Sequence, residues 1–149
     1  MEDRAEAILK KARTVAIVGL SPDPFRPSYA IAEYLKRHGY RVIPVNPSVE
    51  EILGECSYPS LRAIPEAVDV VDIFRRPEDI PGVVEEAIAI GAKAVWMPEG
   101  ISHEGAAARA RACGILVVMD RCMKKELERL RRAGRLSPEP SPSSHRVAS

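Results

Sequence analysis

The residues best suited to chemistry in this chain are those that could bind a phosphate group. Gly19-Leu20-Ser21 ends the apolar run TVAIV, and Arg26 follows in a loop that holds three prolines. A helical pattern then starts at Ser28, which occupies the position of an N-cap. Such a turn directs backbone N–H groups and the positive end of a helix dipole at one point, and a guanidinium adds a matching cation. The pattern predicts a diphosphate site, with the alternative that Gly19 only makes room for a tight strand–helix turn.

Asn46-Pro47 indicates which phosphate ligand such a site would take. A site of the NAD type places a carboxylate at the end of the second strand to bond the free ribose hydroxyls. Asn46 stands at that place, and no acid follows until Glu50. A neutral amide disfavours NAD and permits a ribose that already carries a phosphate, which leaves NADP or coenzyme A. The alternative is that Asn46 only caps the turn before Pro47.

Phe74-Arg75-Arg76 follows a third apolar run and supplies an aromatic ring and two cations. Phe74 could contact an adenine edge and Arg75 a phosphate, or the arginine pair could simply solvate a turn. Cys122 lies beside Arg121 near a predicted helix start, where a thiolate is favoured and thiol exchange is conceivable. The alternative for Cys122 is a half-buried structural role.

The remaining polar residues form no recognisable catalytic set. There is no P-loop, no HExxH motif and no pair of carboxylates spaced for acid–base work. His103 follows Ser102, which is expected to cap the next helix, and is interpreted as a surface residue. Cys113 is predicted to lie in the core. We therefore expect no catalytic residues and no metal site.

The elements that must position these residues alternate along the chain. Apolar runs predict five strands, at 14–19, 40–45, 68–74, 94–97 and 115–119. Helical spacing predicts helices at 2–12, 28–38, 78–90, 102–113 and 123–132. The weakly patterned stretch 49–61 is expected to cover a sheet edge. This order specifies an α/β fold, a doubly wound three-layer Rossmann-like sheet, with ligands outside the carboxyl ends of the strands.

Length and composition narrow the class of protein. The 149 residues, 46% of them hydrophobic, predict one domain over 1–133. The serine- and proline-rich segment 134–149 is predicted to be a disordered tail. A net charge of +1 gives no reason to expect nucleic acid. Three cysteines without a CxxC motif favour a cytoplasmic location, and neither a signal peptide nor a membrane-spanning run is visible.

Three blocks of the chain resemble a known family. VAIVGLSPDPFRPSYAIAEYLKRHGYRVIPVNP, VDVVDIFRRPEDIPGVVEEAIAIGAKAVW and VVMDRCMKKE are similar to the small stand-alone CoA-binding proteins. Those proteins share their fold with the CoA-binding domain of the succinyl-CoA synthetase alpha subunit. The resemblance runs from about residue 5 to residue 131.

The resemblance implies a coenzyme A site across the strand ends. Gly19, Leu20, Ser21 and Arg26 would serve the diphosphate, with Ser28 and Tyr29 at the start of the following helix. Asn46-Pro47 would lie near the 3′-phosphorylated ribose, Phe74-Arg75 near the adenosine and pantetheine path, and Gly100-Ile101 near the pantetheine arm.

The chain departs from the family in two places. Pro98 follows Met97 where small members have Gln, and no lysine follows the second strand, so Arg75 or Arg76 would replace that cation at the 3′-phosphate. The phosphohistidine domain and the ATP-grasp partner of the synthetase have no counterpart in these residues, so we expect no synthetase activity from this chain.

The sequence thus predicts a protein that binds coenzyme A or acyl-CoA without catalysis, as a carrier, sensor or accessory subunit, with a possible protein partner or homo-oligomer. The alternatives are an NADP-binding module or small reductase, and a thiol-exchange protein that uses Cys122.

Overall fold

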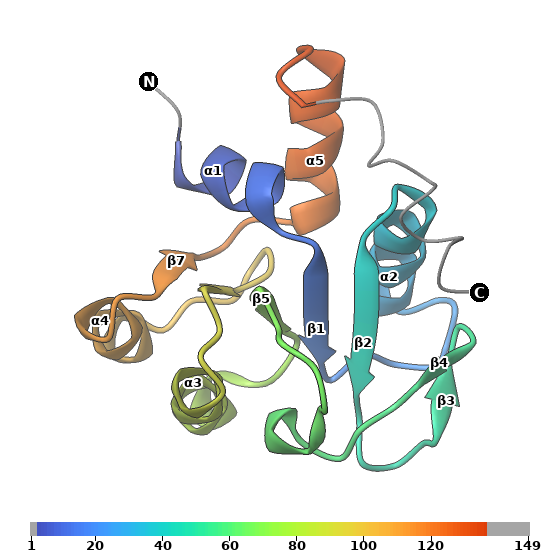
Figure 1. The fold of residues 1–149 in the computed structure, drawn as a ribbon, viewed down its shortest axis with the longest axis vertical. Helices are drawn as coiled ribbons and strands as arrows, with labels where there is room; N and C mark the ends of the chain where they lie inside the picture. Colours follow the sequence, from blue (N-terminus) through green and yellow to red (C-terminus); the bar gives the residue numbers. More distant parts are fainter. Residues whose placement is uncertain (1–2, 137–149) are drawn as a thin grey trace.

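The computed structural model describes residues 3–136, and strands and helices alternate in it around one main sheet (Figure 1). Five parallel strands form this sheet in the order β2-β1-β5-β6-β7. The strands are β1 (Thr14–Val18), β2 (Arg41–Val45), β5 (Val70–Ile73), β6 (Ala94–Trp96) and β7 (Leu116–Val118). Strand order reverses between β1 and β5, which makes the sheet doubly wound and opens a crevice at their carboxyl ends.

Helices cover both faces of the sheet, and a separate core lies under each face (Figure 1). The helices are α1 (Arg4–Lys11), α2 (Pro27–Arg37), α3 (Ile80–Ala89), α4 (Glu104–Ala112) and α5 (Met123–Arg132). Buried residues of α1, α2 and α5 pack on one face, and those of α3 and α4 pack on the other. The predicted three-layer Rossmann-like fold is confirmed, and every predicted strand or helix ends within two residues of its observed bounds.

The edge of the sheet at β2 is closed by the segment whose pattern was weakest. It forms an antiparallel pair, β3 (Glu51–Ile52) with β4 (Glu55–Cys56), followed by a short 3-10 turn, η1 (Leu61–Ala63). Tyr58 donates its backbone N–H to the carbonyl oxygen of Pro44 at 3.0 Å. Pro44 lies inside β2, and a proline is tolerated there because β2 is an edge strand of the sheet.

The end of the described chain packs against α1. The Arg135 guanidinium contacts the Glu6 carboxylate at 2.9 Å, and Leu136 packs on the core shared by α1, α2 and α5. Residues 134–136 of the predicted tail thus touch the domain, and 137–149 lie outside the described residues. Within 3–136, no helix is both long and apolar enough to span a bilayer.

Candidate functional site

A cavity of about 780 Å³ opens at the carboxyl ends of the strands, where the loops after β1, β5 and β6 meet. We name it the strand-end cavity. Seven of the predicted site residues line it: Gly19, Ser21, Arg26, Ser28, Phe74, Arg75 and Ile101. Its volume lies within the range of about 300–1,000 Å³ that is usual for small-molecule sites.

Gly19 allows the loops after β1 and β5 to approach each other closely. Its φ is +84°, a conformation that favours glycine, and a Cβ added there would lie 2.2 Å from the carbonyl oxygen of Phe74. Backbone hydrogen bonds hold both loops. The N–H of Gly19 donates to the carbonyl oxygen of Val45 at 2.9 Å, and the N–H of Phe74 donates to the carbonyl oxygen of Val18 at 2.8 Å. The close approach is therefore built into the backbone. Gly19 thus also makes the tight turn that is its predicted alternative role.

The proline-rich loop after Ser21 is held by its own polar side chains. The Ser21 hydroxyl accepts from Asp23 N–H at 3.0 Å, and the Asp23 carboxylate accepts from Phe25 N–H at 2.9 Å. Phe25 is 94% exposed. Asx and ST turns of this kind order a loop without regular structure, so Arg26 reaches the cavity from a defined backbone.

The start of α2 differs from the prediction. Arg26 is the N-cap residue and Pro27 the first helical residue, so the prediction that Ser28 caps the helix is wrong. Proline suits the first helical position because the N–H it lacks would have no partner inside the helix. Ser28 instead turns inward, is buried, and accepts a hydrogen bond from Ser21 N–H at 3.1 Å. The helix N-terminus and the Arg26 guanidinium together favour an anion here.

Three arginines and one carboxylate set the charge of the strand-end cavity. Arg26, Arg75 and Arg76 line it, together with Asp79, the last residue of the 3-10 turn η2 (Pro77–Asp79). Asp79 Oδ2 lies 3.5 Å from Arg75 Nη2 and 3.8 Å from Arg76 Nε. The lining side chains therefore carry a net charge of +2, which suits a ligand with several negative charges.

Asn46 supports the first loop and does not line the strand-end cavity. Its side-chain amide donates to the carbonyl oxygen of Leu20 at 2.9 Å, and its side-chain oxygen accepts from Ser48 N–H at 2.8 Å. Both ends of the amide are thus engaged within the protein. This geometry matches the structural alternative, in which Asn46 caps the turn before Pro47.

Four other predicted residues lie away from the wall of the strand-end cavity. Leu20 is fully buried beneath the first loop, and Tyr29 is half-buried against the same core. Pro47 lines an adjoining cavity of about 290 Å³, which shares Arg75 with the strand-end cavity. Gly100 lies in the loop after β6, where its N–H donates to Asp120 Oδ1 at 2.6 Å.

The two cysteines and the histidine near the other strand ends lie outside the strand-end cavity. Cys122 is half-buried at the N-cap of α5, makes no side-chain capping bond, and does not line the strand-end cavity, so thiol exchange stays a prediction. Cys113 is exposed, and its predicted burial is wrong because it follows the last turn of α4, at the surface. His103, not Ser102, caps α4, since its Nδ1 accepts from Ala106 N–H at 3.0 Å.

The two acidic residues of the third apolar run also lie apart from the strand-end cavity. Asp69 Oδ2 accepts from the N–H groups of Arg13 and Thr14, at 2.9 Å each, and so joins the starts of β1 and β5. Asp72 is buried within the sheet beside Ile17, and burial raises the pKa of its carboxyl well above the usual value. Among residues 3–136, no group of three acidic, histidine or cysteine side chains is placed to hold a metal ion.

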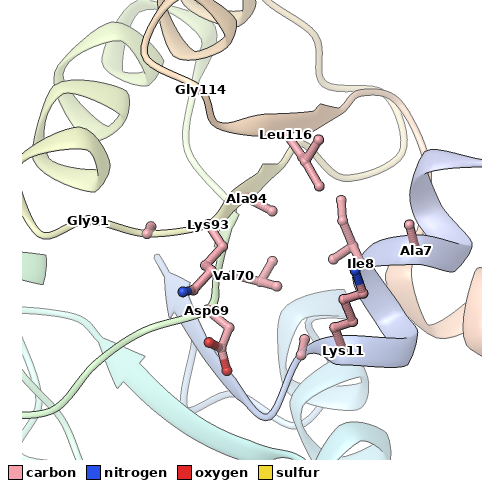
Figure 2. A pocket seen from close by; sticks show the side chains of 12 residues that line it. Ala7, Ile8, Lys11, Asp69, Val70, Gly91, Lys93, Ala94, Gly114 and Leu116 are labelled. Carbon is pink, nitrogen blue, oxygen red and sulfur yellow. The ribbon is translucent and has the colours of Figure 1, made fainter.

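A second cavity, of about 600 Å³, lies at the opposite end of the strands and contains none of the predicted site residues (Figure 2). Figure 2 shows the apolar side chains of Ile8, Val70 and Leu116 around a common space, with Lys11 and Lys93 on opposite sides of it. This cavity lies beside α1 and lacks a helix N-terminus. The site that the sequence predicts is the strand-end cavity.

Sequence reasoning missed Asp79, which lines both the strand-end cavity and the adjoining cavity. A signal was present, because an acid four residues after Arg75 at a helix start can fold back onto the arginine. The chain pattern did not reveal that this carboxylate would line the strand-end cavity.

Comparisons with known proteins bear on the family and the fold of this chain. The family model described as "CoA binding domain" matches residues 13–128. The uncharacterized protein YneT of Bacillus subtilis is 38% identical over 117 residues, which cover 78% of this chain and 87% of YneT. The solved structure of a hypothetical protein from Pyrococcus horikoshii OT3 matches this chain with 41% sequence identity and a TM-score of 0.84. The match covers 87% of this chain and 92% of the Pyrococcus chain.

A larger relative shares only this domain. Acetate–CoA ligase (ADP-forming) II of Archaeoglobus fulgidus is 35% identical over 96 residues, which are 62% of this chain but 14% of the ligase. The chain thus corresponds to one small part of that enzyme. The family model and the fold agree, and the chain belongs to the CoA binding domain family, which binds coenzyme A.

Proposed function

We propose that the strand-end cavity holds coenzyme A or acyl-CoA, and that the diphosphate lies against the loop after β1. The observation that carries this proposal is the position of Arg26 at the N-cap of α2, on the wall of a cavity with net positive lining. Backbone N–H groups, a helix dipole and a guanidinium are the groups that proteins use for a diphosphate. The arginines after β5 offer a second anchor for the 3′-phosphate.

We propose further that the chain binds its ligand without catalysis, as a carrier, sensor or accessory subunit in the cytoplasm. The groups around the cavity are suited to binding anions, and the ligase relative matches this chain over only 14% of its length. A CoA-binding unit that corresponds to one part of a ligase would need a partner, or a second copy of itself, to act on an acyl group. Native mass measurement of the purified protein would identify such an assembly and any retained ligand.

Calorimetric titration with coenzyme A tests the proposed site. The Arg26→Ala variant is expected to weaken coenzyme A binding by about 10- to 150-fold, since a hydrogen bond to a charged group contributes about 1.5–3 kcal/mol. Arg37→Ala is the matched control, because Arg37 lies at the other end of α2, and its 64% exposed side chain does not line the cavity. We expect this control to bind like the parent. No binding at millimolar coenzyme A would overturn the proposal.

NADP is the second candidate, because Arg75 and Arg76 could equally face a 2′-phosphate on the ribose. A competition titration separates the two ligands. If the site belongs to coenzyme A, NADPH will displace it weakly or not at all. Tighter binding of NADPH than of coenzyme A would reverse the order.

A further inference from the structure

Asp79 lies where the strand-end cavity meets the adjoining cavity, and it lines both of them. Its Oδ2 is 3.5 Å from Arg75 Nη2 and 3.8 Å from Arg76 Nε. One carboxylate thus faces the two cations after β5, which are the groups available to a ligand phosphate. Its backbone N–H donates to the carbonyl oxygen of Arg76 at 2.9 Å, so the turn itself sets this approach.

Among the described residues, the Asp79 carboxylate is only loosely paired. Asp79 occupies the N-cap position of α3 but makes no side-chain capping bond. Its distances to the two arginines exceed the 2.7–2.9 Å of a strong charge-assisted hydrogen bond. Its side chain is also 32% exposed, which means that water screens the pairing. A loose ion pair of this kind can be displaced by a better anion.

We propose that Asp79 competes with the ligand for Arg75 and Arg76 and so limits the affinity of the site for phosphorylated ligands. In the empty site the carboxylate neutralises part of the arginine charge. A phosphate monoester, which carries a charge of about −1.5 to −2 at neutral pH, displaces it. A ligand without that phosphate leaves the pairing intact. The inference rests on the proposed coenzyme A site and adds a residue that keeps binding reversible, as a carrier or sensor needs.

The test compares coenzyme A with dephospho-CoA, which lacks the 3′-phosphate, on the parent and on the Asp79→Asn variant. Removing the competing charge is expected to tighten coenzyme A binding by about two- to fivefold, the size of an exposed ion pair. Dephospho-CoA should bind both proteins equally. The gain for coenzyme A should also shrink at high salt, because the competing pair is screened.

Glu78→Gln is the matched control. It removes the same charge one residue away, and Glu78 lies 3.5 Å from Arg76 Nε but does not line either cavity. Glu78 approaches Arg76, whereas Asp79 approaches both Arg75 and Arg76. We therefore expect Glu78→Gln to tighten coenzyme A binding less than Asp79→Asn does, and to leave dephospho-CoA binding unchanged. If Asp79→Asn fails to fold, as judged by its circular dichroism, Asp79→Ser provides the same test, since serine is also a good N-cap.

Three results would overturn the inference while leaving the proposed function intact. Weaker coenzyme A binding by Asp79→Asn would mean that Asp79 positions Arg75 for the ligand. An equal gain for coenzyme A and dephospho-CoA, or an equal gain in Glu78→Gln, would indicate a general charge effect. Unchanged affinities in all variants would show that no competition occurs. Failure of the parent to bind coenzyme A at all would instead refute the proposed function.

Discussion

Replacing Gly19 by alanine is expected to destabilise the protein more than the same change at a glycine with equal φ and free space. Gly19 and Gly114 have φ of +84° and +82°. A Cβ at Gly19 would lie 2.2 Å from the Phe74 carbonyl oxygen, well below the 3.0 Å under which real contacts essentially never occur, while a Cβ at Gly114 meets nothing within 4 Å. The two substitutions therefore share the backbone cost and differ in the steric one.

The magnitudes follow from these two terms. A left-handed conformation costs a non-glycine residue about 1–2 kcal/mol, and this cost applies at both positions. Overpacking adds about 1–3 kcal/mol at Gly19 alone, because the Phe74 carbonyl belongs to backbone that hydrogen bonds hold. The free energy of unfolding should thus fall by about 2–5 kcal/mol in Gly19→Ala and by about 1–2 kcal/mol in Gly114→Ala.

Urea denaturation of the two variants and the parent, followed by circular dichroism, measures this difference at constant m. Coenzyme A titration gives a second reading, since only Gly19→Ala displaces the wall of the strand-end cavity. Equal losses of stability in the two variants would refute the steric argument. Equal losses would mean that the loops after β1 and β5 move apart at little cost in free energy.

Two further substitutions test other parts of the structure. Asp72→Asn should stabilise the protein at pH 7 but not near pH 3, because burial raises the folded-state pKa of the Asp72 carboxyl. The contribution of Asp72 to the stability of the parent is therefore fully present below the unfolded-state pKa. Above that pKa it falls by up to about 1.4 kcal/mol per pH unit until the folded-state pKa is reached. A difference between the two urea curves that does not change with pH would contradict this reasoning. His103→Ala should lower the free energy of unfolding by about 1 kcal/mol through loss of the α4 cap, and Ser102→Ala should change it by less than about 0.5 kcal/mol. The reverse ranking would restore Ser102 as the cap.

The fold was predictable because its signals are local. Each parallel strand is a short apolar run, and each helix shows an apolar stripe at helical spacing, so a window of about ten residues carries the information. The carboxyl ends of parallel strands also share one side of the sheet. Seven site residues could therefore be grouped by their position after a strand, before any contact was known.

The two errors in helix capping occurred where neighbouring residues compete for one role. Arg26 caps α2 because Pro27 starts the helix and the Ser28 hydroxyl accepts from Ser21. His103 caps α4 although Ser102 belongs to a better capping type. A capping preference ranks residue types, but the backbone path into the helix decides which side chain reaches the free N–H groups.

The sequence by itself determined the order of strands and helices, the end of the sheet at which the strand-end cavity lies, and the family. The tertiary structure alone decided which side chains meet there. The carbonyl of Phe74 lies against Gly19, and the amide of Asn46 supports Leu20, across intervals of 55 and 26 residues. Asp79 faces the arginines only because the turn after β5 folds back on itself. Local pattern determines each element, whereas contacts between distant loops depend on how the whole sheet assembles.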